Sequence, residues 1–319
     1  MKIAVNRVKN WVFVTGEIRG GTTFVGKILS LPLEVDYIHE PFNIRCGMPG
    51  MTKRWRYVKP SLDTPEMQEI HEAASRIFSY NFHLRNSPFK NEAIHRKIIK
   101  QLVGTRGPYY LRLAKMNPFH KHAVIKDPTG TLLTEYLHVH FGVKPVVVIR
   151  HPASFIASLR RANWWPDTRK VLDQQPLLVQ DHFNGDISSW FNEHSDELQN
   201  AAAHWRLLTQ VVVNQAKQYS DWHLVTLESL SENPVVQFKE LYGKLGLPWS
   251  ANIEKKILNT TQVKGKAEVK NNLVQDFKRD SAKIFELRKN SLTKEERRKI
   301  FDIVKDVALD FYSEESFSI

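Results

Sequence analysis

The sequence predicts an α/β fold in which helices cover a central parallel sheet of about five strands. Short apolar runs rich in β-branched residues indicate strands buried on both faces; these are Val12–Thr15, Val35–His39, Ala123–Ile125, Pro145–Ile149 and Trp222–Leu227. Helical patterns lie among these runs, at about Gly21–Leu31, Asn91–Val103, Thr131–Phe141, Ala153–Arg161 and Pro234–Leu245. Strands that alternate with helices favour parallel pairing through right-handed crossovers.

Two long stretches exceed the connections that such a sheet needs. Residues 44–120 mix helix with Pro- and Gly-containing loops, and residues 163–190 carry three tryptophans among Pro, Asp and Asn. Loops of this length in a compact domain usually bind a ligand or form a lid. We therefore predict a single domain over residues 1–319 in which 44–120 and 163–190 are binding or lid insertions.

The C-terminal part begins with a basic, irregular stretch over residues 260–290. An amphipathic helix follows at about Thr293–Tyr312. Thr293 and Glu296 have the spacing of a capping box, in which each side chain bonds the other residue's backbone N–H. The helix is therefore predicted to begin just after Thr293.

The composition is that of a globular protein with a basic surface. Of the 319 residues 42% are hydrophobic and 25% charged, and the formal net charge is +12. Such a surface attracts anions, but we find no zinc-ligand spacing and no recognised nucleic-acid module. Cys46 is the single cysteine, which favours a reducing compartment, and no stretch approaches the ~20 apolar residues of a membrane span. We expect a cytoplasmic protein with no membrane span and no specific nucleic-acid partner.

The most informative segment is the glycine-containing loop after the first predicted strand. It reads Gly16-Glu17-Ile18-Arg19-Gly20-Gly21-Thr22-Thr23, close to the phosphate-binding pattern G-x-x-x-x-G-K-S/T. Backbone N–H groups and a helix N-terminus can hold an anion there. Thr22 replaces the Lys that grips the terminal phosphates of a nucleotide triphosphate, and a cation stands three residues earlier, at Arg19. The loop is therefore predicted to hold a phosphate without hydrolysing ATP.

Further polar residues fall at the carboxyl ends of other predicted strands, where ligands of parallel sheets bind. Glu40 follows the second strand, Lys126 the third and Arg150 the fourth, and Ser158 lies on the next helix. Arg150 and Ser158 can converge on one phosphate through the guanidinium fork and the hydroxyl. The alternative is a strand-end charge and an unrelated residue on the helix surface.

Together these motifs resemble the sulfotransferases that use 3′-phosphoadenosine 5′-phosphosulfate (PAPS). Their 5′-phosphosulfate loop, approximately R-S/G-G-S/T-S/T, is matched by Arg19-Gly20-Gly21-Thr22-Thr23. Their 3′-phosphate motif, R-x-P followed by Ser, is matched by Arg150-His151-Pro152 and Ser158. Glu40-Pro41-Phe42 and Lys126-Asp127-Pro128 are similar to segments of the carbohydrate and tyrosyl-protein sulfotransferases. The resemblance covers residues 11–42 and 122–250 and implies a P-loop NTPase-like, three-layer fold with helical insertions.

The resemblance also implies roles for individual residues. The cofactor-binding residues would be Arg19, Gly20, Gly21, Thr22 and Thr23 for the 5′-phosphosulfate, and Arg150 and Ser158 for the 3′-phosphate, with no metal required. Glu40 would be the general base for the acceptor hydroxyl, or a carboxylate that only orients Arg19. Lys126 would contact the transferring group, or form a salt bridge with Asp127 or Glu40. Strand alternation places the His39 ring on the face opposite Glu40.

We therefore predict an enzyme that transfers a sulfuryl group from PAPS to a hydroxyl by in-line displacement, leaving adenosine 3′,5′-bisphosphate (PAP), with a carbohydrate or glycoconjugate as the acceptor. The stretches 44–120 and 163–190 would form the acceptor side, and 260–290 would cover the cofactor. Two alternatives are a nucleotide kinase or NTPase with a degenerate P-loop, which Thr22 disfavours, and a non-catalytic binder of polyanions. The sequence contains no signal for the oligomeric state.

Overall fold

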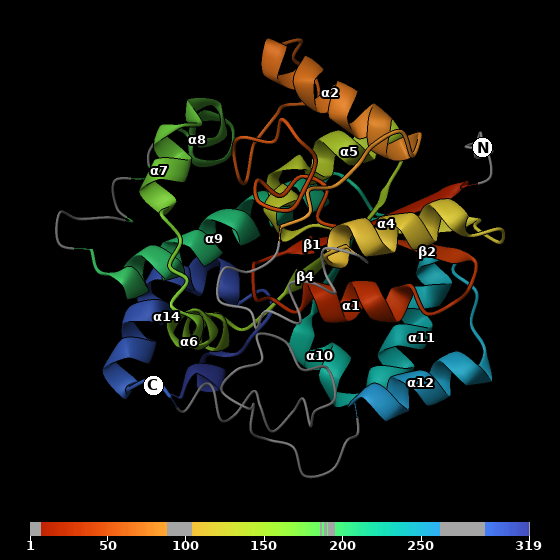
Figure 1. The fold of residues 1–319 in the computed structure, drawn as a ribbon. Coiled ribbons are helices and arrows are strands. Elements are labelled where there is room, and N and C mark those ends of the chain that lie inside the picture. The colour runs from red at the N-terminus through yellow and green to blue at the C-terminus, as the bar shows by residue number, and fades with distance from the viewer. Residues whose placement is uncertain are drawn as a thin grey trace.

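The computed structural model describes residues 8–87, 104–185, 187, 190, 195–261 and 291–318. Its centre is a parallel sheet of five strands in the order β2-β3-β1-β4-β5 (Figure 1). The strands are β1 (Asn10–Gly16), β2 (Val35–His39), β3 (His122–Lys126), β4 (Lys144–Ile149) and β5 (His223–Thr226). Every strand overlaps one of the apolar runs, so the predicted sheet is confirmed.

Helices cover both faces of the sheet, which gives the predicted three layers (Figure 1). One face packs through Val12 and Val14 of β1 against α1 (Thr22–Leu29), α10 (Leu227–Glu232), α11 (Pro234–Leu245) and α12 (Ala251–Thr261). The other face packs through Phe13 and Val147 against α2 (Pro65–Phe78), α5 (Thr134–Phe141), α6 (Pro152–Ala162), α9 (Glu197–Ala216) and α14 (Lys294–Ala308). Alternating side chains of each strand therefore enter two separate cores.

The two long insertions contribute ordered elements of their own. Residues 44–120 contain α2 and α4 (Arg106–Met116), and residues 163–190 contain α7 (Thr168–Asp173) and α8 (Pro176–Phe183). Trp55 of the first insertion and Leu172 of the second meet Leu207 of α9 in one buried cluster. Apolar packing thus holds both insertions against the same helix.

A buried aspartate ties together the loops at the carboxyl edge of the sheet. Asp127 accepts hydrogen bonds from the Phe42 backbone N–H at 2.7 Å and from the Thr129 backbone N–H at 2.9 Å. The Thr15 hydroxyl donates to the Asp127 carbonyl at 2.8 Å. Burial, together with the charge of Glu40, raises the pKa of Asp127. These bonds fix the ends of β1, β2 and β3 relative to one another.

Two predicted helix boundaries are corrected. The segment Thr131–Phe141 begins as the 3-10 helix η2 (Pro128–Leu133), and α5 starts only at Thr134. The reason is a pair of contacts, one of them tertiary: the Thr131 hydroxyl lies 2.9 Å from the Gly16 carbonyl of β1 and 2.9 Å from the Pro128 carbonyl. The predicted capping box of Thr293 and Glu296 is confirmed, but α14 ends at Ala308 rather than Tyr312 and is followed by η4 (Glu314–Phe317).

The predicted helix Asn91–Val103 and nearly all of the stretch 260–290 lie outside the described residues. Within the ranges that are described, no helix is both long enough and apolar enough to cross a membrane.

Candidate active site

The loop between β1 and α1 has the backbone geometry of an anion site. Gly21 adopts φ +95°, and a Cβ there would lie 2.5 Å from Leu227 Cδ1, so the position requires glycine. The Gly20 N–H donates to the Glu17 carbonyl at 2.9 Å, which closes the turn. Gly21 is the N-cap of α1, with no side chain capping the first turn and no acidic residue in it. Thr22 and Thr23 therefore begin α1 with backbone N–H groups suited to an anion.

Arg19, Arg150 and Ser158 come together although they are far apart in the sequence. Arg19 Nε donates to Ser158 Oγ at 3.3 Å, and Arg150 Nη1 donates to the Arg19 carbonyl at 2.8 Å. The Arg19 guanidinium also lies over the ring of Trp164, 5.4 Å from its centroid. The 5′-phosphosulfate loop and the residues predicted for the 3′-phosphate are thus in direct contact.

Arg150 is a buried cation whose hydrogen-bonding capacity is incompletely used. It is 3% exposed, and burial lowers its pKa, partly offset by the charge of Glu228. Its Nε has no hydrogen-bond partner among the described residues. A bound phosphate would satisfy this donor and offset the desolvated charge. The residues present therefore fit an anionic group between Arg150 and Ser158.

Glu40 and Lys126 form an ion pair at the same carboxyl edge of the sheet. Lys126 Nζ donates to Glu40 Oε1, and the Lys126 side chain is almost fully buried. Glu40 Oε2 accepts from Asn43 Nδ2 at 2.7 Å, and Cys46 Sγ lies 3.6 Å away. Burial opposes ionisation of Glu40, but the Lys126 ammonium outweighs it, so the pKa of Glu40 is lowered. Glu40 is an ionised carboxylate at neutral pH.

The expected separation of His39 from Glu40 is wrong. His39 Nε2 lies 3.7 Å from Glu40 Oε1, while His39 Nδ1 is 3.0 Å from the Tyr37 hydroxyl. The cause is that Glu40 has left the strand with φ +50°, so alternation no longer applies to it. Burial lowers the pKa of His39, helped by the Lys126 charge. His39 is a neutral, buried neighbour of the carboxylate.

Two residues near the loop were not singled out from the sequence. Glu17 belongs to the loop and is buried, although a charged residue directly after a strand would ordinarily be assigned to solvent. Trp164 was only one of several tryptophans in an insertion, and its contact with Arg19 spans 145 positions (164 − 19). Only the fold places these side chains at the edge. Within the described ranges, no cluster of His, Cys, Asp or Glu could hold a metal ion.

The five-stranded parallel sheet and its glycine loop define a P-loop-like α/β protein. The model of the sulfotransferase family matches residues 12–251. The chain therefore belongs to the sulfotransferase family, whose members transfer a sulfuryl group and use PAPS as its donor.

Several solved structures are similar to the chain. The sulfotransferase domain of the Synechococcus PCC 7002 olefin synthase is 13% identical, with 96% of each chain covered and a TM-score of 0.46. Sulfotransferase STF9 from Mycobacterium avium is 13% identical, with 96% of this chain and 78% of that chain covered and a TM-score of 0.46. Retinol dehydratase, solved with retinol and PAP, is 17% identical, with coverages of 96% and 84% and a TM-score of 0.44. No curated protein sequence matches the chain.

Proposed function

We propose that the enzyme transfers a sulfuryl group from PAPS to a hydroxyl of a carbohydrate or glycoconjugate, with Glu40 as the general base. The observation that carries the proposal is the convergence at one sheet edge of the Gly16–Thr23 loop, the Arg150–Ser158 pair and the Glu40–Lys126 pair. A donor with a phosphate group at each end requires two anion sites of this kind.

The donor would be held through its two charged ends. The N–H groups and hydroxyls of Thr22 and Thr23 suit the 5′-phosphosulfate, and Arg150 with Ser158 suits the 3′-phosphate. Arg19 belongs to the loop, but its Nε donates to Ser158, so we assign its charge to both ends. PAPS supplies a sulfuryl group already activated by its bond to a phosphate. Fixed donors at the loop favour the charge that develops on that phosphate.

Glu40 is suited to take the acceptor proton. The acceptor oxygen forms a bond to sulfur while the bond from sulfur to the bridging phosphate oxygen breaks, and the hydroxyl proton passes to Glu40. The ionised carboxylate can accept this proton, and Lys126, already beside it, is placed to neutralise charge on the transferring group. Neither role requires a metal ion.

The proposal of a sugar acceptor is supported by the aromatic and basic side chains of the insertions. Trp55 and Trp190 are buried in the core, so they are not available to a ligand. Trp164 is 40% exposed and adjoins Arg19, so it offers an aromatic face to a sugar ring. We propose that 44–120 and 163–190 form the acceptor side of a single domain. A cytoplasmic location is part of this proposal, since one cysteine cannot form an internal disulfide.

Thermal unfolding with three ligands tests the donor assignment. PAP should raise the melting temperature clearly more than AMP or ATP at equal concentration, because only PAP engages both phosphate sites. Equal stabilisation by all three would contradict it. Labelled PAPS offered with sugars, lipids, phenols and peptides then tests the acceptor class, and transfer to a phenol or peptide alone would exclude a carbohydrate.

A further inference from the structure

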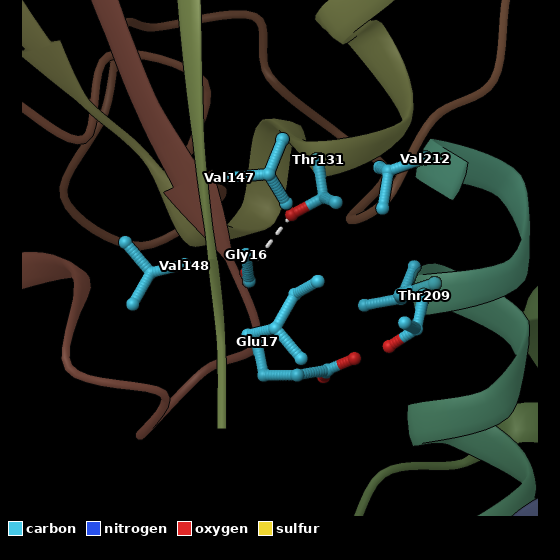
Figure 2. Close-up of a pocket in the computed structure, with 9 residues that line it drawn as sticks. Gly16, Glu17, Thr131, Val147, Val148, Thr209 and Val212 are labelled. Atoms are coloured by element: carbon cyan, nitrogen blue, oxygen red, sulfur yellow. Dashed lines mark hydrogen bonds between the residues drawn. The ribbon is translucent and has the colours of Figure 1, made fainter. Parts of the chain in front are cut away.

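Glu17, the acidic residue of the anion-binding loop, takes no part in the mechanism above. It follows Gly16, is 3% exposed, and neither of its carboxyl oxygens has a hydrogen-bond partner in the described parts of the chain. Figure 2 shows its carboxyl group directed away from β4 and toward Thr209 of α9. The loop predicted to bind the most anionic part of the donor thus contains a buried acid.

The surroundings of Glu17 cannot solvate a carboxylate. The side chain enters a small cavity of about 10 Å³, at the lower limit for one water molecule. An ionised carboxylate accepts about four hydrogen bonds. The side chains around the cavity are aliphatic or carry hydroxyls, and none titrates: Thr131, Val147, Ile149, Leu208, Thr209 and Val212. Burial accordingly raises the pKa of Glu17 well above its ordinary value.

The nearby ionisable groups do not act as counter-ions to Glu17. Arg19, two residues further along the loop, donates to Ser158, and Arg150, which follows Ile149, donates to the Arg19 carbonyl. On the neighbouring elements, Asp127 before η2 bonds Phe42 and Thr129, and His204, one turn before Leu208 on α9, packs on Trp55. An ionised Glu17 would instead compete with a bound phosphate for the arginine charges.

We propose that Glu17 is a protonated carboxylic acid at neutral pH, buried against α9 so that the loop meets PAPS without a negative charge. Glu17 touches no reacting atom in this scheme. Its protonation rests on the structure alone, whereas the consequence for PAPS rests on the proposed function. Since Glu17 is ionised in the unfolded chain above its ordinary pKa, folding at neutral pH takes up one proton.

Protonation is tested without ligand by comparing the wild type with Glu17→Gln, which is neutral at every pH. The infrared spectrum of the wild type at pH 7 should contain a carboxylic-acid carbonyl band that E17Q lacks. The folding equilibrium of E17Q should improve over that of the wild type by up to tenfold for each pH unit above about 4.3. The measured quantity is the change of this ratio with pH. A difference in stability that the amide causes equally at every pH therefore does not affect the test. The control T209V changes the same cavity but keeps Glu17, so the ratio of its folding equilibrium to that of the wild type should not change with pH.

PAP affinity at pH 7, measured by calorimetry, tests the consequence. The dissociation constants of wild type and E17Q should agree within about threefold, because both loops are uncharged at this position. E17Q binding about tenfold more tightly would show that Glu17 is ionised and repels the ligand, and binding tenfold more weakly would show that the carboxyl itself is needed; either result overturns the proposal. Absence of the infrared band or of the pH slope overturns it independently of any ligand.

Discussion

Lys126, at the end of β3, forms an ion pair with Glu40, which follows β2, although 86 positions separate them. The parallel register of the two strands sets His39 opposite Lys126, so the next residue, Glu40, falls within reach of the ammonium group. Both groups lie at the edge of the sheet that also carries the Gly16–Thr23 loop. An anion that binds there competes with Glu40 for the Lys126 charge, which links donor binding to the basicity of Glu40.

Replacing Glu40 by Gln should lower kcat by about 100-fold or more, because a positioned general base contributes that much. PAP affinity should be retained, since the amide leaves the Lys126 charge for the ligand. Steady-state kinetics and calorimetry on one preparation measure both quantities. Glu240→Gln serves as the control, because Glu240 is an exposed glutamate of α11 that pairs with Lys244, outside both insertions. A large loss of PAP affinity with kcat unchanged would make Glu40 structural.

Ser158→Ala should weaken PAP binding by about tenfold, the cost of one charge-assisted hydrogen bond, and leave AMP binding nearly unchanged. The matched control is Ser154→Ala, one turn earlier on α6, whose buried hydroxyl has no partner among the described residues. Calorimetric titrations of the two variants with PAP and AMP separate the sites. An equal loss for both nucleotides would place Ser158 away from the 3′-phosphate.

Gly21→Ala should destabilise the fold by about 1–3 kcal/mol, because its φ of +95° is one that residues with a Cβ rarely adopt. Gly243 provides the contrast: it lies in α11, and a Cβ there meets nothing within 4 Å. Gly243→Ala should therefore stabilise by about 0.5–1 kcal/mol. Urea unfolding measures both changes. A tolerated G21A would mean that the loop does not need this backbone conformation.

Protonation of His204 in the unfolded chain should lower the stability of the enzyme below pH 6.5, a contribution opposite in sign to that of Glu17. Burial lowers the pKa of His204 to about 3, so the folded protein holds it neutral while the unfolded chain takes up a proton. The neutral His204 side chain makes its full contribution to stability above the pKa that histidine has in the unfolded chain. This contribution is lost as the pH falls toward the pKa that His204 has in the folded protein. Between pH 7.5 and 5.5 the loss attributable to this group is about 1.4 kcal/mol.

Comparing the wild type with His204→Leu isolates this effect. Between pH 7.5 and 5.5 the unfolding free energy of the variant should fall by about 1.4 kcal/mol less than that of the wild type. His39 is also buried and neutral, but it is present in both proteins, so its effect cancels in the comparison. Parallel pH dependences of the two proteins would exclude His204 as the cause.

The sheet could be predicted because a buried parallel strand leaves a local signal. Val35–His39 was predicted with the bounds that β2 has, and the glycine loop marked the start of α1. Residues at strand ends could be assigned to one edge from topology alone, which is why Glu40, Lys126 and Arg150 were expected together. Helix ends were less predictable, since η2 depends on a hydrogen bond from Thr131 to the distant Gly16 carbonyl.

The sequence alone therefore determined the fold class, the loop and the residue types at the sheet edge, because periodicity and glycine act over a few neighbouring positions. Tertiary structure decided which side chains face one another. Arg19 meets Ser158 across 139 positions, Glu40 turns back toward His39 through its positive φ, and Glu17 is buried rather than exposed to water. Burial and charge pairing depend on surfaces that only the packed sheet and α9 bring together, so the protonation states of these acids follow from the fold.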